Sequence, residues 1–375
     1  MMILWAGTAV DAKYSGGTGE PNDPYRIANA EDLNDIGNYE EDWNKHFILV
    51  NDVNLAQYTG TQFNRIGKAW NNAFTGVFDG NDHKIWNFTW DSNGIAGVGL
   101  FGYVGNGGLV KNLGIENVDV NAINGGFVGG LVGENWGTIT NCYSTGSVSG
   151  SSLVGGLVGY SEENGTITNC YSTGSVSGTG DAVGGLVGEN CWSGTITNCY
   201  STGSVTGDNY VGGLVGENYW YGTISNCYST GNVTGTEGVG GLVGWNGHCF
   251  PDEFECRPAP GLIYKSYSTG RVKGSSNVGG LVGVHIAGEV GASFWDVDTS
   301  TQTTSAGGTP KTTAEMKTIA TFTDADWDFI EIWGIGENQT YPFLRFAPAG
   351  DLNYDKKVDL LDFAILASHW LEGPP

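Results

Sequence analysis

The chain has 375 residues, 63 of them glycine and only 10 proline, and it carries a formal net charge of −24. This charge excludes proteins that bind nucleic acid through its phosphate backbone, and it disfavours anionic membrane surfaces. Hydrophobic residues make up 39% of the chain, which is enough to bury a core, and no apolar run approaches the roughly 18 residues of a membrane span.

The N-terminal region begins with an apolar stretch from Met1 to Val10. This stretch lacks a basic region and is short for a signal peptide. We therefore expect a secretory signal to lie upstream of it or to have been removed.

Further along, the sequence FDGNDHK brings Asp79, Asp82 and His83 close together. Gly80 and Asn81 favour a turn between two strands at this point. The alternative is an acid–base site of a polysaccharide-degrading enzyme, which would need clustered carboxylates on one face.

A repeat of about 28 residues dominates the middle of the chain. The motif VGGLVG begins at Val128, Val154, Val183, Val211, Val239 and Val278, and NCYSTG follows in each of the first four copies. Short runs of Val, Ile, Thr and Tyr broken by Gly, Asn and Ser predict strands joined by turns, without the 3.6-residue period of a helix. One such unit cannot cover its own apolar side chains. We therefore expect an all-β chain whose units stack into a right-handed parallel β-helix (β-solenoid) of about eight coils.

The sequence predicts four parts of the chain. Residues 1–96 form an N-terminal cap and the first β-helix coils, and residues 97–291 form the repeat β-helix. Residues 292–347 form a C-terminal capping segment, and residues 348–375 form a short tail of different character.

Equivalent positions of successive coils should stack into rows. Val128, Leu131, Ile139 and Val148 and their equivalents are expected in the core. Three other rows hold asparagine (Asn141, Asn169, Asn198, Asn226), cysteine (Cys142, Cys170, Cys199, Cys227) and tyrosine (Tyr143, Tyr171, Tyr200, Tyr228, Tyr267). The asparagines can satisfy backbone groups of the turns, and the cysteines are expected to be buried thiols that pack as small hydrophobic side chains. The Gly-Gly pair of VGGLVG predicts a bend or a close approach of two backbones.

The turn after VGGLVG is aromatic in most coils. The residues are Trp136, Tyr160, Trp192, Tyr219, Trp220, Tyr221 and Trp245. Stacked in register, they would line one edge of the rod, and exposed aromatic rings suit the apolar C–H faces of sugars. The alternative is that these side chains fold over the corner and shield it.

Glutamates follow VGGLVG in three coils, at Glu134, Glu189 and Glu217. Tyr160, Trp245 or Val284 takes the same place in other coils. Because the row is broken, we expect a solvated acidic face rather than a catalytic row.

Two cysteines lie apart from the repeat. Cys249 and Cys256 bracket an acidic insertion that lengthens the fifth step of the repeat to 39 residues. A disulfide between them would staple this loop, and export would permit it. Cys191 sits in a turn and is expected to be a free thiol; the odd number of cysteines leaves other pairings open.

The repeat resembles the GLUG repeat of bacterial secreted and surface proteins. The likeness rests on VGGLVG, an aromatic or Asn-rich turn and NCYSTG, and it covers roughly residues 97–291. YSGGTGEPNDPYRIANAEDLNDIGN before it and SFWDVDTSTQ after it are similar to the segments that flank such repeats. The resemblance implies a β-helical stalk or adhesin-like surface module, and it implies no enzyme activity.

The tail resembles the first half of a type I dockerin. In DLNYDKKVDLLD, oxygen ligands for calcium would come from Asp351, Asn353, Asp355, Asp359 and Asp362, with a backbone carbonyl from Lys357. The resemblance implies a module that calcium folds and that binds a cohesin-like partner. Lys356 stands where glycine is usual, and no second loop–helix half follows in this sequence, which puts the cohesin partner in doubt. The alternative is an acidic tail with a short surface helix.

These features predict an extracellular or cell-surface structural or adhesion protein without catalytic residues. Its rigid β-helix would present a glycan- or protein-binding edge to a polysaccharide, and calcium would occupy the tail. One alternative is a polysaccharide-degrading enzyme or an accessory component of a cellulosome-like complex. Another is a self-associating filament subunit, because the ends of a solenoid are sheet edges that can pair unless they are capped.

Overall fold

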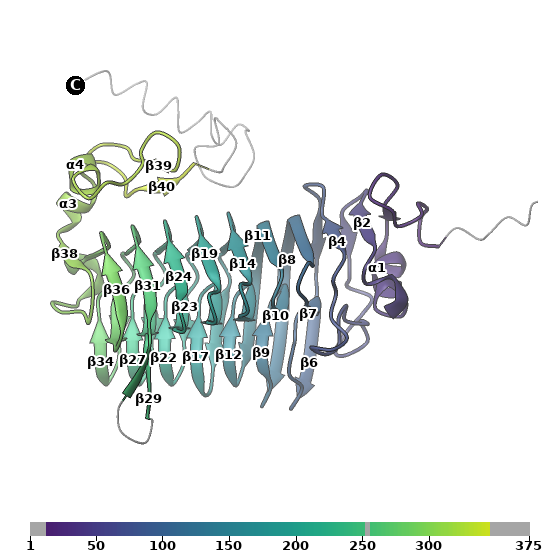
Figure 1. The fold of residues 1–375 in the computed structure, drawn as a ribbon, viewed down its shortest axis with the longest axis horizontal. Helices are drawn as coiled ribbons and strands as arrows, with labels where there is room; N and C mark the ends of the chain where they lie inside the picture. Colours follow the sequence, from purple (N-terminus) through teal and green to yellow (C-terminus); the bar gives the residue numbers. More distant parts are fainter. Residues whose placement is uncertain (1–12, 252–255, 346–375) are drawn as a thin grey trace, which may run out of the picture. The chain divides into compact units, whose positions relative to one another are not determined.

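The computed structural model describes residues 13–251 and 256–345. The chain divides into two compact units, residues 1–312 and residues 313–375. The first unit is a parallel β-solenoid of about eight coils (Figure 1), so the predicted fold class is confirmed.

The coils from β9 to β35 contribute strands to three parallel sheets, and the first coils contribute to the third sheet only. The first sheet has six strands: β9 (Gly126–Gly129), β12 (Ser152–Gly155), β17 (Asp181–Gly184), β22 (Asn209–Gly212), β27 (Glu237–Gly240) and β34 (Ser276–Gly279). The second has seven: β7 (Phe101–Val104), β10 (Val132–Asn135), β13 (Val158–Ser161), β18 (Val187–Asn190), β23 (Val215–Asn218), β28 (Val243–Asn246) and β35 (Val282–His285). The VGGLVG motif therefore runs from the first sheet into the second.

The third sheet has 23 strands and forms three columns. The first column is β1 (Tyr25–Ile27), β2 (His46–Leu49), β4 (Val77–Asp79), β8 (Leu109–Ile123), β11 (Thr138–Gly150), β14 (Thr166–Thr168), β19 (Thr195–Thr197), β24 (Gly222–Ser225), β31 (Gly261–Tyr264) and β36 (Gly288–Gly291). The second adds β3 (Val53–Asn54), β5 (Lys84–Trp86), β15 (Tyr171–Ser172), β20 (Tyr200–Ser201), β25 (Tyr228–Ser229), β32 (Tyr267–Ser268), β37 (Phe294–Asp296) and β38 (Thr309–Lys311). The third adds β6 (Thr89–Asn93), β16 (Ser175–Gly178), β21 (Val205–Thr206), β26 (Val233–Thr234) and β33 (Val272–Lys273).

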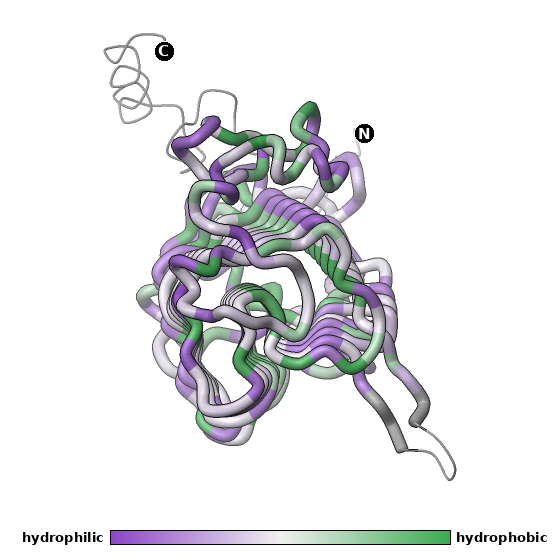
Figure 2. Tube along the Cα trace, turned by 90° about the vertical axis from the view of Figure 1, so that its left-hand side faces the viewer, coloured by the Kyte–Doolittle hydropathy of each residue, from purple (hydrophilic) through white to green (hydrophobic). Residues whose placement is uncertain are grey.

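Identical residues of successive repeats are paired in register. Ile167 pairs with Ile196, and Tyr171 pairs with Tyr200. The side chains of one repeat position therefore form continuous rows along the solenoid axis, which Figure 2 shows as stripes of similar hydropathy. The predicted core residues Val128, Leu131 and Ile139 are fully buried, so the core prediction is confirmed.

The Gly-Gly pair marks a close approach of backbones, as predicted. A Cβ atom on Gly185 would lie 2.2 Å from the carbonyl oxygen of Gly213 and 2.3 Å from the Oγ of Ser201. A Cβ on the preceding Gly184 would lie 2.0 Å from the carbonyl oxygen of Val187. Both positions therefore require glycine for lack of space.

Both ends of the described solenoid are covered. At the first coils, helix α1 (Ala30–Ile36) buries Leu33 and Ile36, and its N-cap Asn29 accepts a 2.9 Å hydrogen bond from the backbone N–H of Asp32. A 3₁₀ turn, η1 (Glu40–Asp42), follows this helix. At the last coil, after helix α2 (Val297–Ser300), the Oγ of Ser305 accepts hydrogen bonds from the backbone N–H groups of Leu281 and Val282. The edges that would favour filament growth are therefore occupied at these positions.

An antiparallel hairpin leaves the solenoid between β28 and β31. It consists of β29 (His248–Pro251) and β30 (Cys256–Ala259), with Cys256 opposite Pro251 and Cys249 opposite Pro258. The loop 252–255 and the side chains of 249–257 lie outside the described part, so the predicted Cys249–Cys256 disulfide stays a prediction.

The second unit is described over residues 313–345. It holds helices α3 (Thr313–Met316) and α4 (Ile319–Thr323) and a short antiparallel pair, β39 (Trp333–Gly334) and β40 (Phe343–Leu344). Its core contains Phe322, Trp327 and Trp333. The ring centroids of Phe322 and Trp327 lie 4.8 Å apart, and those of Trp327 and Trp333 lie 4.6 Å apart. The proposed capping segment 292–347 thus contains the last solenoid strands and this small unit. Among the described residues, no helix is long and apolar enough to cross a membrane.

Candidate functional site

The glutamate row is buried, which corrects the prediction of a solvated acidic face. Glu134, Glu189 and Glu217 are only 6%, 7% and 7% exposed. A glycine precedes each of them, and it lets the first sheet approach closely; a Cβ on Gly216 would lie 2.5 Å from the backbone carbon of Ala182. The row is therefore buried rather than displayed to solvent.

The row follows the second sheet in register, with Tyr160 between the first two glutamates. Glu134 pairs with Tyr160, Tyr160 with Glu189, and Glu189 with Glu217. Glu217 in turn pairs with Trp245. Strands in such a sheet lie about 4.8 Å apart, so Glu189 and Glu217 are carboxyl groups on neighbouring rungs.

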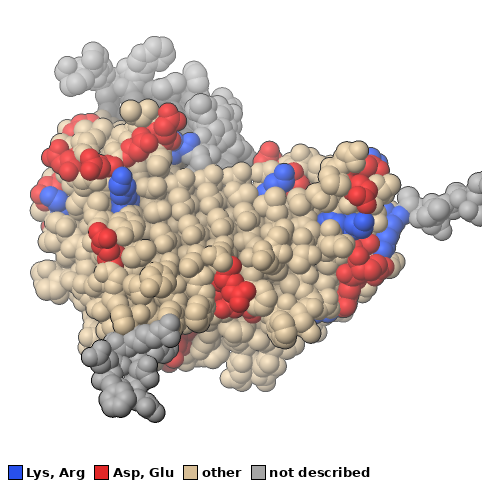
Figure 3. All heavy atoms as spheres, in the orientation of Figure 1, with Lys and Arg blue, Asp and Glu red and all other residues tan. Residues whose placement is uncertain are grey.

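No lysine or arginine occurs between Lys111 and Arg257. The charged side chains of that stretch, histidine aside, are all Asp or Glu. Figure 3 shows the consequence on one face: a group of acidic side chains lies over the middle coils with no basic side chain beside it. The buried row therefore lacks a neutralising lysine or arginine from its own coils.

Aromatic and polar neighbours hold the carboxyl groups instead. The hydroxyl of Tyr219 donates to Oε1 of Glu189 at 2.7 Å. Glu162, at the edge of the row, accepts hydrogen bonds from Nε1 of Trp136 at 3.0 Å and from the hydroxyl of Tyr160 at 2.8 Å. Other contacts join the Sγ of Cys191 to the Tyr160 hydroxyl, at 3.3 Å, and Nε2 of His248 to Oε1 of Glu217, at 3.7 Å.

These surroundings shift the protonation of the row. Burial raises the pKa of Glu134 to about 7, with a further contribution from Glu162. Burial likewise raises the pKa of Glu189 to about 7. Burial, the charge of Glu189 and the charge of Asp181 raise the pKa of Glu217 to about 8. Loss of water around the carboxylate is the main cause in each case, because it disfavours the charged form.

The seven aromatic residues of the predicted edge separate into two groups. Trp136, Tyr160, Tyr219 and Trp245 are half-buried. The polar atoms of Trp136 and Tyr160 bind Glu162, and that of Tyr219 binds Glu189. Trp245 packs edge-on against Tyr210, with ring centroids 4.6 Å apart. These four side chains therefore fold over the corner and shield it, as the alternative prediction stated.

The second group is a platform formed by Trp192 and Tyr221, which are exposed, and Trp220, which is half-buried. The indoles of Trp192 and Trp220 stack with centroids 4.7 Å apart and planes inclined by 7°. Trp192 is 49% exposed and Tyr221 58% exposed. We refer to these three residues as the aromatic platform.

The backbone of the platform is strained. Trp192 and Ser193 have φ of 47° and 65°, and Trp220 and Tyr221 repeat the same pair of values. Two consecutive left-handed residues favour Asn and Gly, and a bulky side chain in this region costs on the order of 1 kcal/mol or more. The platform thus places large aromatic side chains where the turn itself favours small ones.

The cysteine, tyrosine and asparagine rows have structural roles. The tyrosines stack with centroids 4.8 to 5.1 Å apart, and Nδ2 of Asn169 donates to Oδ1 of Asn141 at 3.2 Å. The cysteines of the row are buried thiols outside any disulfide, as predicted, and the same holds for Cys191. They do more than pack, because the Sγ of Cys170 accepts the backbone N–H of Cys142 at 3.4 Å.

A further asparagine row escaped sequence analysis. Asn135, Asn190, Asn218 and Asn246 are fully buried, and Nδ2 of Asn190 donates to Oδ1 of Asn218 at 2.8 Å. The same amide also donates to the carbonyl of Gly194 at 3.0 Å, which closes the turn below the platform. The recurrence of Asn after VGE or VGW in the sequence could have predicted this row.

The acidic turn near the N-terminus shows no paired carboxylates. Asp79 accepts hydrogen bonds from Lys111 and Asn112. Burial alone would raise its pKa, but these bonds hold it below the usual value. Asp82 is exposed with φ of 60°, and His83 contacts Asp52 at 3.1 Å. The arrangement is that of the predicted turn between strands β4 and β5.

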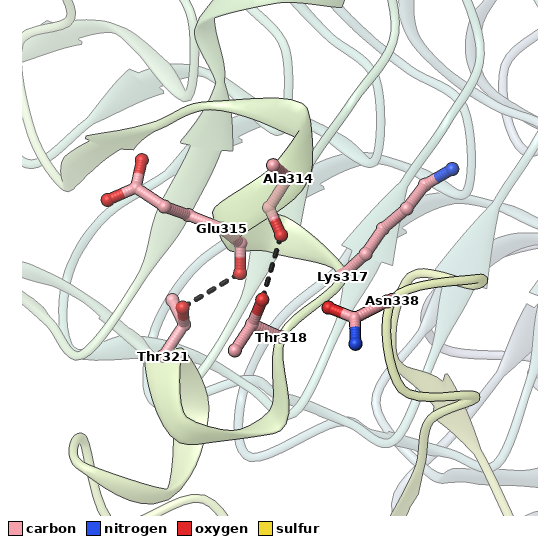
Figure 4. A pocket seen from close by; sticks show the side chains of 6 residues that line it. All are labelled: Ala314, Glu315, Lys317, Thr318, Thr321 and Asn338. Carbon is pink, nitrogen blue, oxygen red and sulfur yellow. Dashed lines mark hydrogen bonds between the residues drawn. The ribbon is translucent and has the colours of Figure 1, made fainter. Parts of the chain in front are cut away.

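Hollows also occur elsewhere in the described part of the chain. One of about 300 Å³ in the second unit is lined by Ala314, Glu315, Lys317, Thr318, Thr321 and Asn338 (Figure 4). Its two threonine hydroxyls donate to backbone carbonyls, and Glu315 and Lys317 point to opposite sides (Figure 4). Another, of about 430 Å³, lies beside Asn87, Asn117 and Asp119. The side chains of Asn87 and Asn117 are hydrogen-bonded to one another.

The predicted calcium ligands Asp351, Asn353, Asp355, Lys357, Asp359 and Asp362 lie outside the described residues. Within the described part of the chain, no group of three His, Cys, Asp or Glu residues could hold a metal ion. The calcium loop and its cohesin-like partner stay predictions.

Comparison with known proteins bears on the repeat itself. Residues 124–149, 150–177, 179–206 and 207–234 match a family model described as "The GLUG motif". Four coils carry the GLUG motif. The GLUG coils include the whole aromatic platform and all three buried glutamates.

Two relatives resemble part of this chain. Halomucin of Haloquadratum walsbyi is 36% identical over 163 residues, which are 42% of this chain and 2% of halomucin. A "Putative Gly-rich membrane protein" of Evansella cellulosilytica is 36% identical over 140 residues, 36% of this chain and 16% of that protein. The chain thus spans a small fraction of the length of both relatives.

A solved structure shares the fold. The crystal structure of a "putative immunoglobulin A1 protease" from Bacteroides ovatus superposes with a TM-score of 0.60 and 23% identity, over 88% of this chain and 95% of that one. At this identity the likeness concerns the fold alone.

Proposed function

We propose that the chain is a rigid cell-surface or extracellular display module that binds glycans through the aromatic platform. The observation that supports this function most directly is the parallel stack of the exposed Trp192 on the half-buried Trp220, with centroids 4.7 Å apart. Pyranose rings offer apolar C–H faces that suit such indoles, and the buried rows beneath hold the platform on a stiff scaffold.

The strain of the platform supports a binding role. Backbone strain of this kind persists where the surrounding structure enforces it, and it clusters at functional sites. The equivalent turn of an earlier coil carries Glu163 and Asn164 with the same left-handed geometry, so the fold of the turn does not itself require tryptophan.

The surface setting rests on the relatives. One of them is named as a membrane protein, and four coils of this chain match the GLUG motif. In this reading the solenoid acts as the spacer and the calcium tail as a docking element.

Binding to insoluble polysaccharides tests the proposal. We expect the full chain to sediment with at least one glycan polymer and to lose most of that binding in Trp192→Ala and in Trp220→Ala. Trp70→Ala is the matched control, because Trp70 is 67% exposed and lies outside the GLUG coils. If the native chain and all three variants sediment with the polymer to the same extent, the proposed glycan-binding function is wrong.

A further inference from the structure

The surroundings of the platform indicate which glycan it fits. Asn164 donates its backbone N–H to the carbonyl of Trp192 at 3.1 Å, and Ser193 donates to the carbonyl of Trp220 at 2.9 Å. The three turns are therefore stacked in register. Glu163 occupies, one coil earlier, the position that Trp192 and Trp220 occupy in theirs.

This register places an acidic side chain beside the open face of the stack. Trp220 covers one face of Trp192. The other face of Trp192 is turned toward the coil that carries Glu163, and both Trp192 and Glu163 are exposed. A ring that stacks on this face therefore lies next to the Glu163 carboxylate.

A second carboxylate lies next to the first along the chain. Glu162 is half-buried and accepts hydrogen bonds from Trp136 and Tyr160, which fix its position. Glu162 also lies close enough to the buried Glu134 and Glu189 to raise the pKa of each. Because no Lys or Arg occurs between residues 112 and 256, no lysine or arginine of these coils offsets this charge.

We infer that the aromatic platform takes a cationic glycan, a polymer of amino sugars with free amines, whose ring stacks on Trp192 and whose ammonium groups face Glu163 and Glu162. The inference rests on the proposed function and specifies its ligand. A cation over an indole face is attracted by the ring quadrupole, and flanking carboxylates add a Coulombic attraction. Uronic acid and sulfated glycans would meet repulsion at the same place.

The test compares two oligosaccharides of equal length on the full chain by calorimetry. One is a glucosamine hexasaccharide with free amines, and the other is its N-acetylated form. We expect the free amine form to bind about tenfold tighter or better, and its affinity to fall as NaCl is raised. Trp192→Ala should abolish binding of both, whereas Glu163→Gln should remove most of the preference for the free amine form.

Matched controls separate these effects from changes in folding. Glu237→Gln alters an exposed carboxylate on β27, and Trp70→Ala alters an exposed indole; both should bind as the native chain does. Equal affinity for the two oligosaccharides, lost in Trp192→Ala, would overturn the cationic ligand and leave the glycan-binding function standing. If neither oligosaccharide binds, or if polylysine alone binds through Trp192, a cationic glycan is not the ligand.

Discussion

The backbone N–H of Cys142 donates a hydrogen bond to the Sγ of Cys170 in the next coil, with 3.4 Å between nitrogen and sulfur. Cys170 repeats the arrangement with Cys199, and Cys227 donates to the Oγ of Ser266 at 3.1 Å. The row therefore works as a series of acceptors for backbone groups at the corner between two columns of the third sheet.

Substitution of one member of this row should separate packing from hydrogen bonding. Cys170→Ala removes an acceptor of the buried Cys142 N–H, which costs about 1–3 kcal/mol. Cys170→Ser should cost clearly less, because Ser266 already fills this role in the fifth repeat and donates its own proton to the carbonyl of Tyr264. Urea unfolding measures both. An equal loss in the two variants would contradict the acceptor role.

The buried glutamates should make the solenoid less stable at high pH. Their pKa values of about 7 to 8 in the folded chain lie above the ordinary value of 4.5. The folded chain therefore binds more protons than the unfolded chain between these values, and the stabilisation is complete below about 4.5 and lost as the pH rises through 7 to 8.

Thermal unfolding of Glu217→Gln checks this dependence. The amide cannot ionise, so we expect a smaller loss of Tm between pH 6 and pH 9 than in the native chain, a range chosen around the pKa of about 8. The exposed Glu237→Gln is the control and should keep the native slope. A native slope in Glu217→Gln as well would show that this carboxyl does not carry the effect.

The second glycine of VGGLVG should tolerate no side chain. In Gly185→Ala the Cβ would meet the Gly213 carbonyl at 2.2 Å, which is backbone and cannot rotate away. We expect a loss of about 3 kcal/mol or failure to fold. Gly126→Ala is the control, since its Cβ would have only the carbonyl oxygen of Ser152 nearby, at 3.8 Å. Similar stabilities in urea would contradict the close approach.

The covered ends predict a molecule that does not polymerise. Sedimentation of the full chain should give the same mass at all protein concentrations, in contrast to a filament subunit. A chain that ends at Ser300 loses Ser305 and exposes the last strands of two sheets, so it should associate, whereas a chain that ends at Thr312 keeps this cover. Association of the longer form to the same extent would argue against capping by this segment.

Calcium should bind to the tail. Calorimetry with the full chain is expected to show one site of micromolar order or tighter, as in sensor-type loops. Asp351→Ala should abolish it, because position 1 of such a loop supplies a direct ligand, and Asp208→Ala on the solenoid should not. If the full chain shows no heat of calcium binding, the tail is an acidic extension, and the prediction of a cohesin-like partner is wrong as well.

Much of the fold follows from the repeat, because identical residues every 28 positions must stack once strands are parallel. The core and ladder rows were accordingly predictable. The environment of Glu134, Glu189 and Glu217 was not, since it depends on how closely a glycine lets a different sheet approach. Local sequence likewise could not separate exposed Trp192 from half-buried Trp136, because the two occupy different positions of turns that differ in length.

The register of the coils has a mechanical consequence. A pull along the solenoid axis loads the rungs in series, and each coil is attached to the next by its backbone bonds and by side-chain rows such as Asn141–Asn169. Coils should then open one at a time from an end. Each opening would release the 28 residues between such neighbours, about 95 Å of extended chain, so the module would lengthen stepwise under tension and leave the remaining coils intact.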